Sequence, residues 1–318
     1  MLRKYSKTNY GISAHRKQTF HKVIIIGLIG AVLISGGAFI NIQRVRVIKE
    51  HKNLVQLWKD GSYREVFDLS AVELEKKPLD FFLLSIHGFA AYQLAAAQIN
   101  TEDMLIYTDE SISALRKALL IKDNARDGRL YYVLGKAYYY KGADYAELAI
   151  KYLELALNSS YKAEDIPEYL GLSYALIHDY QKSVEAFSIA LVPADQEEDK
   201  ISKSDILLLS IAKSYLELGE YNSARAYLIR CLEVSRDFST ISKARLLLGN
   251  ILLEEGNTEE AEKQYMAVLQ EGGEQADARY QLGELYLSRG ESIKARAEWR
   301  KAVRIDPAYG PALAKLRM

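Results

Sequence analysis

The residues most suited to chemistry are five histidines, one cysteine and a few paired acids, which could serve as metal ligands, a nucleophile or acid–base groups. The histidines are His15, His21, His51, His87 and His178. They are scattered along the chain and never fall at metal-ligand spacing on one helix face. No glycine-rich phosphate loop occurs, and no serine or cysteine lies in a nucleophile motif. The sequence therefore predicts a non-catalytic protein without a metal or a cofactor.

The paired acids and the cysteine have simple structural explanations. Glu254–Glu255 and Glu259–Glu260 are best explained as solvated charges at helix ends and in first turns. A single cysteine, Cys231, allows neither an intramolecular disulfide nor a Cys-based metal site. We interpret Cys231 as a small packing residue, because it stands where a repeating helical pattern requires one.

That repeating pattern is clearest in residues 276–309. Its regularly spaced residues are Leu282, Gly283, Tyr286, Gly290, Ala295, Trp299, Ala302 and Pro307. Gly283 and Ala302 are small where two antiparallel helices would cross closely. Gly290 is suited to end the first helix, and Pro307 to stop the second. The segment is therefore predicted to form a helical hairpin.

The same pattern recurs 34 residues earlier. Its members there are Leu248, Gly249, Gly256, Ala261 and Tyr265. In residue types and period the pattern resembles the tetratricopeptide repeat (TPR). The resemblance covers about residues 47–309 and implies an all-α, right-handed superhelical solenoid of about seven helix-turn-helix hairpins. Several stacked hairpins are required because one hairpin cannot bury its apolar face alone.

The repeat pattern and the residues outside it divide the chain into five predicted segments. They are a basic tail at 1–22, a transmembrane helix at 23–40, degenerate TPR-like hairpins at 41–127, TPR repeats at 128–309 and a short capping helix at 310–318. Within the degenerate part, the connection from about Gln98 to Thr108 is longer than the two to eight residues usual for a helix–helix joint. It is either a binding loop or a tolerated surface insertion. An acid-rich segment at 193–203 lengthens a later turn.

Charge is distributed unevenly, although the formal net charge is zero. Residues 1–49 contain nine bases and no acid, which leaves 33 bases against 42 acids in the remainder. A repeat body with this negative charge repels phosphate backbones. We therefore expect no binding to nucleic acid.

Residues 23–40 form an apolar run interrupted only by a serine hydroxyl. At about 1.5 Å per residue, this run nearly spans a hydrocarbon core of about 30 Å. We interpret it as an uncleaved anchor, with a signal peptide cut near residues 36–38 as the alternative. Six bases precede the run and three follow it shortly. The positive-inside rule then predicts a single-pass protein of the cytoplasmic (inner) membrane, with a cytoplasmic N-terminus and periplasmic or extracytoplasmic repeats.

In the TPR family, the first helices of successive hairpins line a concave groove, so the resemblance implies that partners bind there. The groove-facing offsets of the family select mostly aliphatic and aromatic residues in this sequence. They are Tyr132, Lys136, Tyr139, Tyr140, Leu172, Leu209, Lys213, Leu216, Leu246, Asn250, Leu253, Tyr280, Glu284 and Leu287. Co-chaperone TPR domains clamp a terminal carboxylate with a Lys and Asn set, of which only Asn250 is retained. The apolar groove instead favours an amphipathic helix or an extended peptide.

These observations predict a membrane-anchored scaffold for protein or peptide partners. The chain resembles membrane-anchored bacterial TPR proteins that act in envelope assembly, secretion or protein maturation. One alternative is a binding module for a cell-wall glycan or a lipid around Tyr132, Tyr139 and Tyr140, because aromatic faces suit sugar rings. The acid-poor third unit would suit an anionic lipid head. Another alternative is a structural subunit of a larger membrane complex.

Overall fold

A computed structural model describes residues 51–121, 127–159, 161–191, 205–272 and 275–317. The predicted anchor at 23–40 and the acid-rich turn at 193–203 lie outside these ranges. Within the ranges, no helix is both long enough and apolar enough to cross a membrane. All the regular elements in them are helical. The predicted all-α fold class is therefore confirmed for the described chain.

The helices form successive antiparallel pairs. The pairs are residues 51–59 with α2 (Tyr63–Lys76), α3 (Phe81–Ala96) with α4 (Thr101–Ile121), α5 (Gly128–Tyr140) with α6 (Ala146–Leu157), α7 (Ile166–Leu176) with α8 (Tyr180–Ala190), α10 (Asp205–Glu217) with α11 (Tyr221–Val234), α12 (Phe238–Glu254) with α13 (Thr258–Gly272), and α14 (Ala276–Ser288) with α15 (Ser292–Ile305). A short 3-10 segment, η1 (Ala143–Tyr145), joins α5 to α6, and α16 (Gly310–Arg317) follows the last pair.

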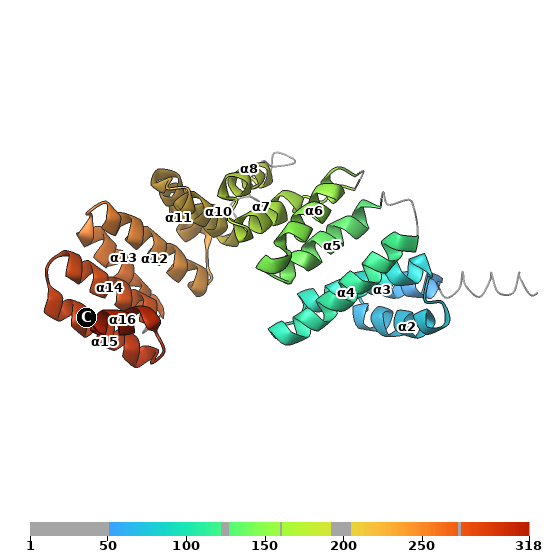
Figure 1. The fold of residues 1–318 in the computed structure, drawn as a ribbon, viewed down its shortest axis with the longest axis horizontal. Coiled ribbons are helices and arrows are strands. Elements are labelled where there is room, and N and C mark those ends of the chain that lie inside the picture. The colour runs from blue at the N-terminus through green and yellow to red at the C-terminus, as the bar shows by residue number, and fades with distance from the viewer. Residues whose placement is uncertain (1–50, 122–126, 160, 192–204, 273–274, 318) are drawn as a thin grey trace, which may run out of the picture.

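The pairs stack along a curved path, which Figure 1 shows from the blue N-terminal pair to the red C-terminal pair. First helices contact one another in sequence: α3 meets α5, α5 meets α7, α7 meets α10, α10 meets α12 and α12 meets α14. The second helix of each pair packs against the first helix of the next. In the middle of the stack, α5, α7, α10 and α12 lie on the inner side of the curve, and α6, α8, α11 and α13 on the outer side (Figure 1). Successive first helices therefore share one surface.

The close crossing of the two helices in a pair explains why glycine recurs at the same position of successive pairs. A Cβ atom at Gly283 would lie 2.2 Å from Trp299 Nε1, and one at Gly249 would lie 2.4 Å from the Tyr265 ring. Glycine is required at both positions because neither large ring can move away without disturbing the core. The turn after α14 places Gly290 at a φ of 78°, a left-handed conformation that glycine adopts without strain.

The structure corrects the predicted long connection between residues 98 and 108. Helix α4 already begins at Thr101, so only residues 97–100 join it to α3. Asn100 Oδ1 accepts a hydrogen bond from Glu102 N (2.9 Å) at this start, and acids in the first turn suit the helix dipole. The extra length of this unit lies in a helix of 21 residues rather than in a loop.

The last pair is covered by α16. Ala312 is fully buried and packs in one cluster with Trp299 and Ala302. Arg296 Nη2 also donates to Leu316 O (3.2 Å). This short helix shields an apolar face that would otherwise end the stack exposed to water.

Candidate functional site

Helix α5 places three functional side chains on one face. The helix begins after Asp127, whose carboxylate accepts a hydrogen bond from Arg129 N (3.2 Å). Tyr132, Lys136 and Tyr140 then follow at intervals of four residues, so their side chains share a face of the helix. The apolar residues of α5 pack into the core on the remaining faces. The direction of these three side chains is thus a consequence of local sequence.

Lys136 lies at the centre of a cluster of tyrosines, with only 9% of the residue exposed. Its Nζ donates to Asp165 Oδ2 (2.8 Å) and to Tyr132 Oη (3.0 Å). Tyr132 Oη in turn donates to Asp165 Oδ2 (2.8 Å). The ring centroids of Tyr169, Tyr132 and Tyr92 lie 4.2, 5.0 and 5.7 Å from the ammonium. The carboxylate and the rings together offset the cost of burying this charge.

The surrounding tyrosines are connected across three helical pairs. Tyr140 Oη of α5 lies 3.3 Å from Tyr169 Oη of α7, and the ring of Tyr139 meets that of Tyr169 edge-on at 5.3 Å. Burial raises the pKa of Tyr92, Tyr132 and Tyr169 well above the ordinary tyrosine value. These hydroxyls therefore stay protonated near neutral pH and can both donate and accept hydrogen bonds.

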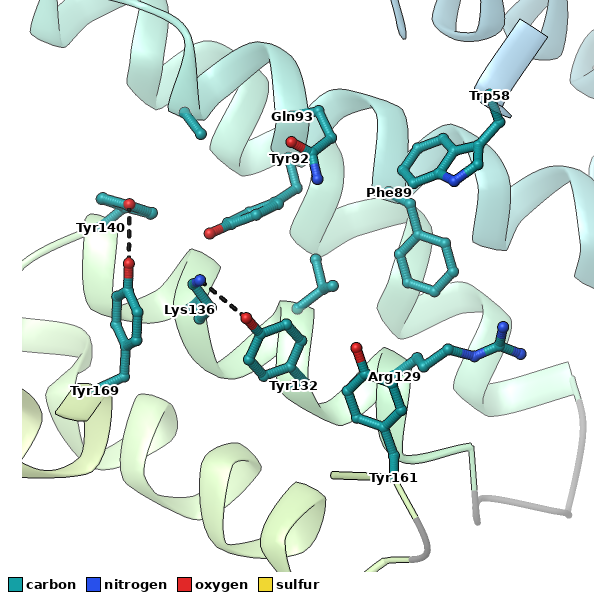
Figure 2. Close-up of a pocket in the computed structure, with 12 residues that line it drawn as sticks. Trp58, Phe89, Tyr92, Gln93, Arg129, Tyr132, Lys136, Tyr140, Tyr161 and Tyr169 are labelled. Atoms are coloured by element: carbon teal, nitrogen blue, oxygen red, sulfur yellow. Dashed lines mark hydrogen bonds between the residues drawn. The ribbon is translucent and has the colours of Figure 1, made fainter. Parts of the chain in front are cut away.

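A pocket of about 400 Å³ opens over this cluster, and we call it the tyrosine pocket. It is lined by Trp58, Phe89, Tyr92, Gln93, Ala96, Arg129, Tyr132, Val133, Lys136, Tyr140, Tyr161 and Tyr169. Figure 2 shows their side chains converging from several elements. Its second cation, Arg129, is paired with Asp127 (Nε to Oδ1, 3.1 Å). Both cations of the pocket therefore have a carboxylate partner within the fold.

A second pocket, of about 580 Å³, lies between α12 and α14, and we call it the α12/α14 pocket. It is lined by Asn250, Leu253, Glu254, Tyr280, Gln281, Glu284, Leu287 and Ser288. Buried Tyr265 donates its hydroxyl to Asn250 Oδ1 (2.8 Å), which makes the amide nitrogen of Asn250 the donor available to a partner. Glu284 Oε2 accepts a hydrogen bond from Lys315 of α16 (2.7 Å). Leu287 is 41% exposed and offers an apolar contact.

The two pockets gather eight of the residues selected from the sequence. Tyr132, Lys136 and Tyr140 lie in the tyrosine pocket. Asn250, Leu253, Tyr280, Glu284 and Leu287 lie in the α12/α14 pocket. Within each pocket, the structure brings the selected residues together. Binding of a partner to either pocket stays a prediction.

The other six selected residues lie elsewhere. Tyr139, Leu172, Leu216 and Leu246 are half-buried and pack against the cores between pairs. Lys213 is exposed on α10. Leu209 is only 6% exposed and belongs to the core between α10, α11 and α12, so it packs between neighbouring pairs. A single family offset cannot describe both the groove and the interface between neighbouring pairs.

Several residues of the tyrosine pocket were not anticipated. Tyr92 and Phe89 belong to a unit whose repeat pattern is degenerate, and Tyr169 falls between the transferred offsets. Asp165 immediately precedes α7 and does not line the pocket itself, but it accepts hydrogen bonds from Tyr132 and Lys136, which do. The chain has 23 tyrosines among 318 residues, but this count does not indicate which of them meet in the fold.

Ser70, His87 and Glu110 form a hydrogen-bonded chain with the composition of a catalytic triad. Ser70 Oγ lies 2.8 Å from His87 Nδ1, and His87 Nε2 lies 3.2 Å from Glu110 Oε1. Ser70 is fully buried, however, and its hydroxyl also donates to Phe67 O (3.0 Å). A nucleophile must reach a substrate carbonyl, which Ser70 in this position does not. We interpret the chain as a structural network that joins α2, α3 and α4, buried at Ser70 and His87 and half exposed at Glu110.

Metal chemistry has no visible site in the described ranges. No group of three or more His, Cys, Asp or Glu side chains in them is placed to hold a metal ion. The site chemistry is therefore that of aromatic faces, neutral hydroxyls, amides and internally paired charges.

Comparison with known proteins identifies the repeat type. The sequence model of the tetratricopeptide repeat family matches residues 209–275 and 246–309. No curated protein matches the chain by sequence. The TPR resemblance is therefore confirmed. The sequence match extends from α10 to just after α15.

Solved structures with a similar arrangement of helices include a TPR repeat-containing protein and a type IV pilus biogenesis factor. The C-terminal part of a TPR repeat-containing protein from Cytophaga hutchinsonii is 17% identical, with a TM-score of 0.56 over 84% of this chain and all of that one. PilW, a type IV pilus biogenesis factor, is 18% identical, with a TM-score of 0.55 over 72% of this chain and 98% of that one. Pseudomonas aeruginosa pilF is 17% identical, with a TM-score of 0.53 over 72% and 96%. At these identities the similarity shows a shared fold.

Proposed function

We propose that this chain, in which residues 209–309 are tetratricopeptide repeats, is a non-catalytic scaffold that binds protein partners on the surface formed by its first helices. Stacked helical pairs present such a surface continuously, so one partner segment can contact several repeats at once. A catalytic function receives no support from the hydrogen-bonded chain at Ser70, because that serine is buried.

The observation that carries this proposal is the α12/α14 pocket. Two different repeats contribute to it, and both lie in the sequence that matches the TPR family. Leu253, Leu287 and Tyr280 supply apolar contacts, while Asn250 supplies an amide donor for a backbone carbonyl. This combination suits an extended or helical peptide that inserts apolar side chains and pairs its backbone with the amide.

We further propose that the scaffold is tethered to the bacterial inner membrane by residues 23–40, with its repeats outside the cytoplasm. The support is the sequence alone: the apolar run, and the excess of bases before it. Tethering would concentrate partners at the membrane surface. A role in envelope assembly, secretion or protein maturation is consistent with such a tethered scaffold.

Site-specific crosslinking tests partner binding. A photoreactive amino acid at Ser288, which is exposed in the α12/α14 pocket, should yield discrete crosslinked proteins in intact cells. Leu287→Glu in the same chain should lower the yield about tenfold or more, because a carboxylate would have to lose water inside an apolar contact. Crosslinked products are measured by immunoblot against the scaffold.

Ile293 provides the matched control. It is 88% exposed on α15 and does not line the pocket. A photoreactive residue at Ile293 should give no discrete product, and Ile293→Glu should leave the Ser288 crosslinks unchanged. Equal products from both positions, or full crosslinking in a Leu287→Glu protein that keeps its melting temperature, would contradict the proposal.

A further inference from the structure

The tyrosine pocket has a chemistry different from that of the α12/α14 pocket. Its walls combine aromatic faces with hydroxyl, amide, guanidinium and ammonium groups in a space of about 400 Å³, a volume within the range of small-molecule sites, about 300–1,000 Å³. We propose that this pocket binds an uncharged sugar ring of a glycan. The proposal does not depend on protein binding at the α12/α14 pocket.

The charges around the pocket favour an uncharged ligand. The ammonium of Lys136 is paired with Asp165, and the guanidinium of Arg129 is paired with Asp127. Glu168 adds a further acid near Asp165. A phosphate or carboxylate would have to displace Asp165 from Lys136 while facing these acids, and would gain no unpaired cation. The anionic lipid head that the sequence left open is therefore disfavoured.

The aromatic side chains suit the faces of a sugar ring. A pyranose ring has C–H groups on its faces and hydroxyls around its edge. Figure 2 shows five rings around a common space: Phe89 and Tyr92 come from α3, and Trp58, Tyr132 and Tyr161 come from three other parts of the chain. Flat rings of this kind can cover the C–H face of a sugar while the tyrosine hydroxyls remain at its edge.

The polar groups of the pocket suit the hydroxyls of a sugar. The tyrosine hydroxyls in the lining can both donate and accept hydrogen bonds, and Asp165, which is not a lining residue, holds Tyr132 and Lys136 in place. Gln93 adds an amide to the lining. An aliphatic peptide anchor in the same place would cover these groups without pairing them, which is unfavourable. A ligand with both apolar faces and many hydroxyls meets both requirements.

Tryptophan fluorescence provides a direct measurement. The chain has two tryptophans: Trp58 lines the pocket, whereas Trp299 lies in the last helical pair. The purified full-length protein is titrated with three uncharged trisaccharides, namely chitotriose, cellotriose and maltotriose, each to 20 mM. We expect a saturable change in fluorescence with at least one of them. Trp58→Phe should lose this change, and because it lacks the reporting tryptophan, its sugar binding is measured by calorimetry.

Two variants locate the binding. Tyr161→Ala removes a half-buried ring from the pocket and should weaken the best trisaccharide at least tenfold by calorimetry. Tyr221→Ala removes a tyrosine that is 47% exposed on α11 and should leave its affinity unchanged. Circular dichroism at matched concentrations confirms that both variants stay folded.

The lipid alternative is tested with the same proteins. Asp165→Asn would free the charge of Lys136, so this variant should lose trisaccharide affinity and gain affinity for glycerol phosphate, a soluble analogue of an anionic lipid head, measured by calorimetry. If it does not fold, Gln93→Ala replaces it as a second polar variant that should weaken the sugar. The proposal is overturned if no trisaccharide binds at 20 mM, if Tyr161→Ala binds like the unmodified protein, or if the unmodified protein binds glycerol phosphate and Tyr161→Ala does not.

Discussion

At the scale of single residues, pairing within the fold decides what each functional group can do. Lys136 is a cation in the sequence, but Asp165 and three tyrosine rings surround its ammonium in the structure. The same lysine without Asp165 would attract anions, so the carboxylate determines the chemistry of the pocket. The α12/α14 pocket shows the same principle, because Tyr265 occupies the oxygen of Asn250 and leaves its amide nitrogen as the donor.

Cys231 gives a residue-scale prediction. The thiol is fully buried and donates to Asp205 O (3.3 Å), and burial raises the pKa of Cys231 to about 11. We expect a disulfide reagent such as DTNB to label the folded protein far more slowly at pH 8 than the protein in urea, because reaction requires an accessible thiolate. Absorbance of the released thiolate measures both rates. Rapid stoichiometric labelling of the folded protein would show that the thiol is accessible.

The same pKa shift has a consequence for stability. The folded pKa lies above the ordinary value of 9.0, so the folded state binds the thiol proton more tightly than the unfolded state. This contribution to the free energy of unfolding is complete below about pH 9 and is lost as the pH rises toward 11. Cys231→Ala removes the titrating group, so its stability should fall less over this interval. Urea midpoints at pH 8 and pH 10 measure the difference.

At the scale of the helical pair, the contact between a glycine and a large ring brings the two helices together. The ring is Trp299 in the last pair and Tyr265 in the pair before it. The same contact between a glycine and a large ring occurs at the same positions of both repeats. The repeat pattern therefore predicts the close crossing of the two helices as well as the helices themselves. The degenerate units use the same device with other partners, since Gly88 approaches Leu115 between α3 and α4.

Gly283→Ala tests this crossing. Alanine favours the helix by up to about 1 kcal/mol, but overpacking costs about 1–3 kcal/mol, and here the new Cβ would lie 2.2 Å from Trp299 Nε1. We expect a net loss of about 1 kcal/mol in the free energy of unfolding, measured by urea titration. Gly310→Ala is the control, because no neighbouring atom lies within 4 Å of the new Cβ. An equal effect of the two substitutions would contradict close packing at Gly283.

At the scale of the whole molecule, a curved stack offers two separate pockets on one chain. The tyrosine pocket involves α3, α5 and α7, whereas the α12/α14 pocket lies near the opposite end (Figure 1). In a stack each pair contacts mainly its neighbours, so the two sites can differ in chemistry without disturbing each other. If both proposals hold, the chain can bind a glycan and a protein partner at the same time.

The proposed topology gives a prediction for the whole molecule. In a Cys231→Ala background, Ser188→Cys adds an exposed thiol on α8, and Ser6→Cys adds one to the basic tail. A maleimide that cannot cross membranes should label Ser188→Cys in intact spheroplasts and Ser6→Cys only after lysis, because the positive-inside rule keeps the tail in the cytoplasm. Gel shift measures the labelling. The reverse pattern would place the repeats in the cytoplasm and direct the search for partners there.

The sequence by itself determined the helical pairs and the small residues at their crossings. Both follow from local rules, namely the 3.6-residue period of the helix and a repeat of 34 residues that places equivalent contacts at equivalent offsets. Tyr132, Lys136 and Tyr140 could be assigned to one face of a helix in the same way. The long α4 was missed because its first turns lie outside the repeat pattern.

Only the tertiary structure decided which residues meet across pairs. Asp165 and Tyr169 reach Lys136, and Leu209 enters the core, because of how each pair is rotated and displaced relative to the next. That rotation arises from packing between side chains far apart in the chain, so it cannot be predicted from the periodicity of a single helix. The charge-neutral character of the tyrosine pocket, and with it the preference for an uncharged ligand, is therefore a property of the folded stack.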